Sequence, residues 1–239
     1  MPRVEWFAYC WPNRRSEKTV VEITLDFTAA DQERFPLDAA QVRDLLIKGG
    51  ILEKDEVFPE QDLPDERMAW YTSLLVQTAL LFQRKAGHRV NFITQTCYAE
   101  HEYWIALMEH EHCDVGMTAV KLATELVSGK RRLLEEPFRM FTDFARKRLL
   151  PIQTEAIIRA AQRRDIPAIR LERQPYKRED FTDLTKGRTV CPNGLLMLGH
   201  GKYQRVLDGT WSLDLQQDLS SGEDEPDQVA EKILDRLFP

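Results

Sequence analysis

The sequence predicts an α+β fold: an antiparallel or mixed sheet packed by helices, followed by a small α/β unit with a β-hairpin and a C-terminal helix. Two observations predict it. Segments rich in β-branched and aromatic residues alternate with segments of helical apolar spacing across residues 1–148, and shorter versions of both recur after Pro151. Strands and helices that alternate around a hairpin are typical of a sheet covered by helices.

The first domain is expected to span residues 1–148. Its strands are predicted at residues 4–10, 18–27, 89–98 and 102–112, and its helices at residues 38–48, 64–85 and 115–128. The second of these helices is apolar on nearly every side from Leu74 to Phe82, which predicts deep burial. Asp114 is expected to cap the third helix, and Gly129 to end it.

Residues 149–215 are expected to form the small α/β unit, and residues 216–239 an acidic linker with a terminal amphipathic helix. The unit is predicted to hold a helix at 154–164, a strand at 166–171, a polar loop at 172–190 and a hairpin of strands 195–198 and 203–207. The terminal helix, 227–237, has an apolar face that carries Val229, Ile233, Leu234 and Leu237.

The composition excludes some classes of protein. The 239 residues are 43% hydrophobic and 30% charged with a net charge of −6, whereas a nucleic-acid-binding domain is typically basic. Cys10, Cys97, Cys113 and Cys191 form no CxxC pair, which is typical of reduced cytosolic thiols. No signal peptide and no apolar run of membrane-spanning length is found. We expect a cytoplasmic protein with neither nucleic acid nor membrane as a partner.

Basic residues gather locally despite the acidic total. The clusters are Arg14-Arg15, Lys130-Arg131-Arg132, Arg146-Lys147-Arg148 and Arg163-Arg164. One interpretation is that they are solvated helix ends. The alternative is a cradle for a carboxylate-bearing ligand, because arginine can pair with carboxylates through two hydrogen bonds. Arg14, Arg15, Arg131 and Arg132 are the candidate ligand-binding residues.

The stretch at 191–207 (CPNGLLMLGHGKYQRVL) is similar at first sight to a phosphate-binding loop. A Walker loop needs four residues between its glycines and Ser or Thr after its lysine, but here Lys202 is followed by Tyr203. The dinucleotide pattern fails as well, since Gln204 stands where a third glycine is needed. The stretch therefore predicts a glycine-bent hairpin, and no cofactor is expected.

A group of histidines and carboxylates offers a candidate metal site. The group consists of His101, Glu109, His110, Glu111, His112 and Cys113. His110 and His112 would point the same way on a strand, and together with Cys113 or a carboxylate they could offer zinc ligands. The cluster has no standard ligand spacing, and polar residues are common at the strand-to-helix turn where it ends. No G-x-S-x-G elbow or local Cys–His signature occurs, so no catalytic residue is assigned.

Several segments, taken in order, resemble cyanophycin synthetase, the ligase that polymerises aspartate and arginine. The first two are the turn Trp11–Ser16 and the segment 102–127, which contains Glu109, Val115-Gly116 and Leu126-Val127. The third is the stretch Thr154–Ile158 followed by Arg164–Pro167. The fourth is Leu196–Arg205, which is similar to the family's "VQLGYGxxQxRI". The resemblance covers the N-terminal domain of that family and the start of its ATP-grasp region.

The chain also departs from that family. After Asp208–Trp211 the family continues into an ATP-grasp core and a Mur-ligase domain, whereas here the segment 229–239 resembles the part that lies just before the Mur-ligase domain. Some members carry a zinc motif, H-x-x-E-H, on the long N-domain helix. The matching positions here are Ser73, Val76 and Gln77, so zinc hydrolysis by that route is not expected.

The resemblance implies a non-catalytic relative of a domain that holds the growing polymer. The expected function is binding of a charged peptide or polymer, or service as an accessory subunit of a separate ligase, and a homo-oligomer is a further option. One alternative is a structural subunit that docks a Mur-ligase-like partner through the apolar face of helix 227–237. The other is a metal-dependent hydrolase that uses His101, Glu109, His110 and His112.

Overall fold

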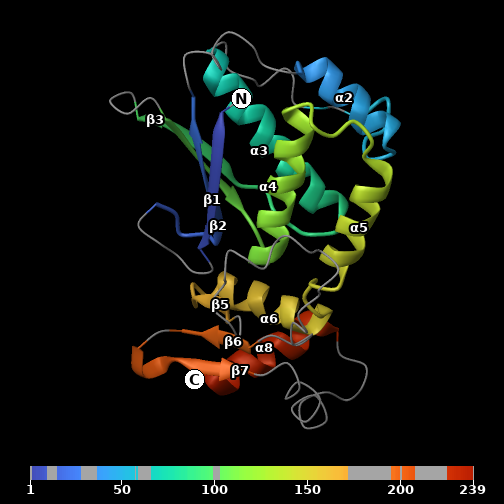
Figure 1. Ribbon diagram of the computed structural model, residues 1–239. Helices are drawn as coiled ribbons and strands as arrows, with labels where there is room; N and C mark the ends of the chain where they lie inside the picture. The colour runs from blue at the N-terminus through green and yellow to red at the C-terminus, as the bar shows by residue number, and fades with distance from the viewer. Residues whose placement is uncertain are drawn as a thin grey trace. The chain divides into compact units, whose positions relative to one another are not determined.

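The computed structural model describes residues 2–9, 15–27, 37–56, 58, 66–98, 103–171, 195–199, 201–207 and 225–238. The chain divides into two compact units, Met1–Leu149 and Leu150–Pro239. Each unit combines an antiparallel sheet with helices, so the predicted α+β fold class is confirmed (Figure 1).

The first unit contains an antiparallel sheet with the strand order β1-β2-β4-β3. Its strands are β1 (Arg3–Tyr9), β2 (Val20–Asp26), β3 (Ile93–Tyr98) and β4 (Tyr103–Glu109). Side chains alternate between the two faces of a strand, and in β2 the fully buried Val21, Ile23 and Leu25 share one face. Ala106 on β4 lies opposite Ile23 and belongs to this same face. It is the face that the helices cover.

The helices of this unit are α2 (Ala39–Lys48), α3 (Arg67–Lys85), α4 (Cys113–Val127) and α5 (Glu135–Arg146). α3 packs on β3 and β4, α4 packs on β1 and β2, and the two helices pack against each other; α5 lies on their outer side (Figure 1). Between Leu74 and Phe82 only Gln77 and Leu81 are partly exposed, which confirms the deep burial predicted for this helix.

Gly116 lets α4 approach the sheet closely. A Cβ atom at this position would lie 2.8 Å from the Cβ of His110 and 2.8 Å from Cγ2 of Val21. No larger residue fits without a shift of the helix, because neither neighbour is the far end of a flexible side chain.

One helix and several boundaries differ from the sequence prediction. The strand expected at 102–112 ends at Glu109, and the helix that follows begins at Cys113 with His112 as N-cap, not Asp114. α5 has no counterpart among the predicted elements. Its signal was Phe138, Phe141 and Ala145 at helical spacing, and the rings of Phe138 and Phe141 pack against Phe82 with centroids 5.5 and 6.3 Å away.

Within its described residues, the second unit pairs a three-stranded antiparallel sheet, of order β5-β6-β7, with the α-helices α6 and α8. Its elements are α6 (Ile152–Arg163), β5 (Ala168–Leu171), β6 (Leu195–Leu198), β7 (Arg205–Leu207) and α8 (Pro226–Leu237). β6 and β7 form the predicted hairpin, in which Gly199 has a φ of +70°. The polar loop expected at 172–190 lies outside the described residues, as do residues 216–224 of the expected linker.

α8 is part of the core of the second unit. Val229, Ala230, Ile233 and Leu234 are all buried, and they share a core with Ala160 and Leu198. α6 and α8 are also joined by ion pairs, with Arg163 and Arg164 both bound to Glu231 at 2.6 and 2.5 Å. The apolar face of residues 227–237, expected to dock a partner, is therefore covered within the chain. Arg163 and Arg164 stand at the end of α6, as the solvated-helix-end interpretation expects, and their partly exposed side chains also pair with α8.

Candidate functional site

A pocket of about 800 Å³ lies between α3 and β3, and we call it the α3–β3 pocket. Its lining includes Phe58, Val76, Leu80 and Ala106, all of which are buried. Val76 and Leu80 come from α3, Ala106 comes from the helix-facing side of β4, and Phe58 lies outside the helices and strands. Polar and charged residues make up the rest of the lining, and sites for small molecules or peptides combine apolar surface with polar groups that orient the ligand.

Polar groups stand among this apolar lining. Ser73 and Gln77 belong to α3, whereas Thr94 and Gln95 belong to β3. Gln77 and Gln95 are both partly exposed, so their amides can act as donors and acceptors towards a ligand. The amide is also the functional group of a peptide backbone, which makes these side chains suitable partners for one.

Charged residues line the pocket near the C-terminal end of α3. Lys85 Nζ lies 2.6 Å from Oε2 of Glu56, and this hydrogen bond lowers the pKa of the Glu56 carboxyl below its usual value. Arg84 donates from Nε to the carbonyl oxygen of Val90 and from Nη2 to Oδ1 of Asn91, both at 2.8 Å. This end therefore holds two cations and one anion among the described residues.

The three positions that the sequence resemblance sets against a zinc motif all line this pocket. They are Ser73, Val76 and Gln77, successive turns of one face of α3. A hydroxyl, an isopropyl group and an amide do not make a zinc site, which needs histidine, cysteine or carboxylate ligands. These three side chains therefore give the pocket polar and apolar surface but no metal ligand.

This pocket is not among the sites predicted from the sequence. Its signals were Gln77 within an otherwise apolar stretch of α3, and Gln95 at a strand position whose alternation places it on the helix-covered face. Each signal alone is weak. The pocket becomes visible only when the fold brings α3 and β3 together.

The candidate arginines lie apart in the first unit. Arg15 pairs with Glu22 at 2.9 Å, and Glu22 alternates with Val21 and Ile23, so this pair lies on the face of the sheet away from the helices. Arg131 instead binds Glu125 of α4 at 2.6 Å, in the helical layer. Arg132 is exposed, and Arg14 lies outside the described residues. Arg15 and Arg131 are not brought together into one cradle.

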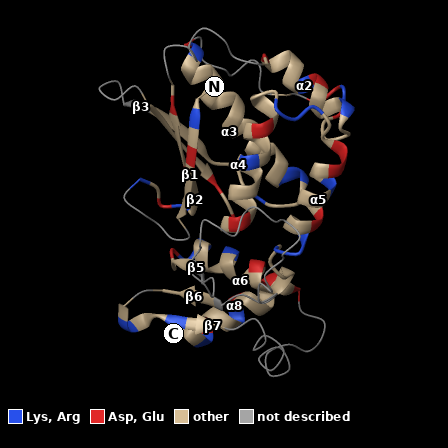
Figure 2. Ribbon diagram, in the orientation of Figure 1, with Lys and Arg blue, Asp and Glu red and all other residues tan. Residues whose placement is uncertain are grey.

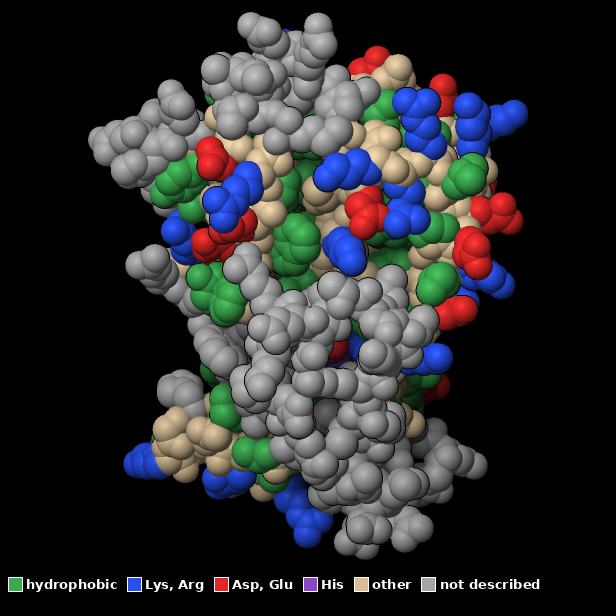
Figure 3. All heavy atoms as spheres, in the orientation of Figure 1, with side chains coloured by type: hydrophobic (Ala, Val, Ile, Leu, Met, Phe, Trp, Pro, Cys, Tyr) green, Lys and Arg blue, Asp and Glu red, His purple; other side chains and the backbone are tan. Residues whose placement is uncertain are grey.

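In all, the described basic and acidic side chains are mixed over the chain. Figure 2 shows Lys and Arg next to Asp and Glu along the helices, and in the upper part of Figure 3 the two kinds are interspersed. No broad basic surface forms on that part of the face. A ligand-binding role for charged residues therefore depends on local groups.

Glu109, one of the candidate metal ligands, is engaged in holding the backbone. Its Oε2 accepts hydrogen bonds from the N–H groups of Asn91 and Phe92, both at 2.8 Å, and its Oε1 lies 2.9 Å from Nζ of Lys18. Oε2 thus fixes the segment that leads into β3, whereas Oε1 is paired with Lys18 just before β2. His101 lies outside the described residues.

His110 and His112 follow β4 and also have structural partners. The ring of His110 is almost fully buried, with Nε2 3.2 Å from the carbonyl oxygen of Tyr9, and burial lowers its pKa to about 4. Nδ1 of His112 accepts a hydrogen bond from the backbone N–H of Asp114 at 3.2 Å and so caps α4.

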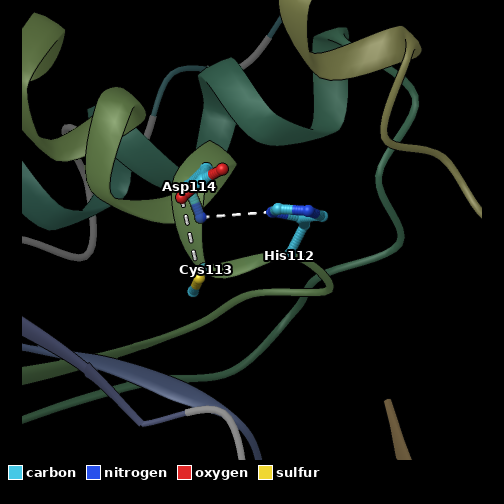
Figure 4. Close-up of side chains that lie close together, drawn as sticks. All are labelled: His112, Cys113 and Asp114. Atoms are coloured by element: carbon cyan, nitrogen blue, oxygen red, sulfur yellow. Dashed lines mark hydrogen bonds between the residues drawn. The ribbon is translucent and has the colours of Figure 1, made fainter. Parts of the chain in front are cut away.

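Among the described residues, His112, Cys113 and Asp114 form a cluster in which metal-ligating atoms lie within 4.8 Å of one another. Figure 4 shows the His112 ring aimed at the backbone nitrogen of Asp114, while the Cys113 thiol lies 3.8 Å from the Asp114 carboxylate. Because a helix cap explains this arrangement, we do not assign it as a metal centre. Glu109 and His110 do not belong to this cluster.

Comparison with known proteins leaves the family open. No model of a known protein family matches the chain, and no curated protein is similar to it at a significant level. The likeness to cyanophycin synthetase rests on the segments quoted above. As for membranes, none of the helices in the described ranges has both the length and the apolar character needed to span one.

Proposed function

We propose that this chain is a non-catalytic, cyanophycin-synthetase-like binding protein that holds a charged peptide or polymer in the α3–β3 pocket. One observation carries the proposal. The positions that match the family's zinc motif, Ser73, Val76 and Gln77, line a pocket of about 800 Å³ and offer no zinc ligands. A site that keeps its cavity without its hydrolytic residues is suited to binding and not to cleavage.

The chemistry of the pocket supports a peptide as the ligand. Buried apolar side chains favour the stems of amino-acid side chains, and the amides of Gln77 and Gln95 match the donors and acceptors of a peptide backbone. The Lys85–Glu56 pair adds charges of both signs at one end, as a polymer of aspartate and arginine would require.

The biological setting is part of the same proposal. A chain that holds the polymer would serve as an accessory subunit to a separate ligase. A cytoplasmic location fits this role, and the widely spaced cysteines, which form no CxxC pair in the sequence, support it.

Titration with a fluorescein-labelled aspartate–arginine polymer tests the proposal, with fluorescence anisotropy as the readout. We expect saturable binding by the wild-type chain. Gln77→Trp should reduce the affinity by about tenfold or more, because the indole fills the pocket. Gln162→Trp is the matched control, since Gln162 is exposed on α6 in the other unit. Absence of saturable binding to the wild type would refute the proposal.

A further inference from the structure

We propose that the ligand of the α3–β3 pocket is an acidic peptide that binds in extended form as an added strand on the outer edge of β3. This inference rests on the proposed function and specifies how the ligand is held. β3 is at one end of the sheet, and among the described residues it pairs with β4 alone. An extended peptide can pair with such an edge by main-chain hydrogen bonds.

The register shows which backbone groups face that edge. The N–H of Glu109 donates to the carbonyl oxygen of Phe92 at 2.9 Å, so the backbone of Phe92 points towards β4. Hydrogen-bonding direction alternates along an antiparallel strand, so Thr94 also points towards β4, whereas Ile93 and Gln95 point their N–H and C=O groups outwards. Ile93, Thr94 and Gln95 all line the pocket, which brings the outer edge and the cavity together.

The helical layer stops short of this edge. The helix-facing residues of the inner strands, such as Ile23 and Ala106, have no exposed surface, while Ile93 and Gln95 on the same face are only partly buried. A peptide strand beside β3 can therefore place alternate side chains between the sheet and α3. Buried alternate side chains give such complexes their specificity.

The charge at the pocket end favours acidic side chains in the ligand. Glu56 is engaged by Lys85, whereas Arg84 donates to the neutral oxygens of Val90 and Asn91. Within the described residues the charge of Arg84 is thus not balanced by a carboxylate. A carboxylate of the ligand near Asn91 would supply that balance. Non-specific attraction cannot explain such binding, because the whole chain has a net charge of −6.

Labelled hexapeptides test the mode of binding, since six residues match the length of β3. The probes are hexa-aspartate, hexa-arginine and two N-methylated forms of hexa-aspartate, one methylated at the odd positions and one at the even positions. Their binding is measured by fluorescence anisotropy. We expect saturable binding of hexa-aspartate, weaker binding of hexa-arginine, and a loss of about tenfold or more for at least one N-methylated form, because methylation removes the donors of the added strand.

Variants of the protein provide the second readout. Gln95→Pro removes an outward-facing N–H and leaves the ladder to β4 intact, so proline is tolerated there; Gln95→Val, which keeps the N–H, is the matched control. Gln95→Pro should weaken hexa-aspartate binding about tenfold relative to Gln95→Val. Glu56→Gln should strengthen it and Lys85→Gln weaken it, each by about threefold, because both groups are partly exposed.

The outcomes separate the two proposals. If neither the aspartate–arginine polymer nor any peptide binds, the proposed function is refuted and this inference with it. If hexa-aspartate binds equally well in its N-methylated forms, or equally well to Gln95→Pro and Gln95→Val, strand addition is refuted and the binding function stands. If hexa-arginine binds more tightly than hexa-aspartate, the acidic ligand is refuted.

Discussion

His110 should make the first unit less stable at acidic pH. Its ring lies between the end of β4 and α4, and burial lowers its pKa from 6.5 to about 4, although hydrogen bonds to the backbone of Tyr9 and Val20 act in the opposite direction. The folded chain therefore keeps this ring neutral at pH values where the unfolded chain protonates it. The free energy of unfolding therefore has its full value above pH 6.5 and decreases as the pH falls towards 4, because the proton binds more strongly to the unfolded chain.

The two pKa values set the size of the effect. They differ by about 2.5, and each unit of pKa corresponds to 1.36 kcal/mol, so His110 alone should lower the free energy of unfolding by about 3 kcal/mol between pH 7 and pH 4. A domain with a total stability of about 5–15 kcal/mol would show such a loss clearly.

Urea unfolding of the wild type and His110→Gln at pH 7, 6, 5 and 4 measures this contribution. Trp104, which is buried in the first unit, provides a fluorescence signal. Glutamine has no charge at any of these pH values and keeps an N–H that can reach the Tyr9 carbonyl oxygen. The difference between the two proteins should therefore change by about 3 kcal/mol over the range, while the titration of other groups cancels. A difference that is constant from pH 7 to pH 4 would refute the reasoning.

Three further changes test the packing. Gly116→Ala should lower the stability of the first unit by about 1–3 kcal/mol in urea unfolding, because its Cβ overlaps the sheet; a wild-type midpoint would contradict this. Gly199→Ala should lower the stability of the second unit more than Gly201→Ala. Both glycines have positive φ, but only a Cβ at position 199 would lie close to the backbone oxygen of Tyr203, at 2.9 Å. Equal losses of stability in the two variants would contradict the importance of this contact. Glu231→Gln should lower the melting temperature of the second unit at low salt, because it removes the α6–α8 ion pairs of Glu231. The difference in melting temperature between variant and wild type should become smaller in 1 M NaCl, where the Debye length is about 3 Å and exposed charges are screened.

The elements that could be predicted are those whose signal is contained in a short window. The burial of Leu74–Phe82 and the hairpin around Gly199 both follow from local pattern and turn chemistry. α5 was missed because Pro137 interrupts the pattern near its start, although proline is tolerated in the first turn of a helix.

The pocket depends on tertiary packing and could not be predicted in this way. Gln77 and Gln95 are eighteen positions apart, and only the turn that follows α3 brings them to one cavity. In the same way, Glu109 was selected as a metal ligand from residue type alone. Its use as an acceptor for two backbone N–H groups depends on the strand register, which the sequence pattern does not contain.

The carboxylate of Glu109 also has a consequence for the energetics of recognition. By holding the N–H groups of Asn91 and Phe92, it fixes where β3 starts, and a slip of the strand by two residues would leave both groups without this acceptor. The outer edge is therefore preorganised: the conformational entropy of ordering β3 is lost during folding and not during association. An incoming chain has to order only itself, which lowers the entropic cost of binding.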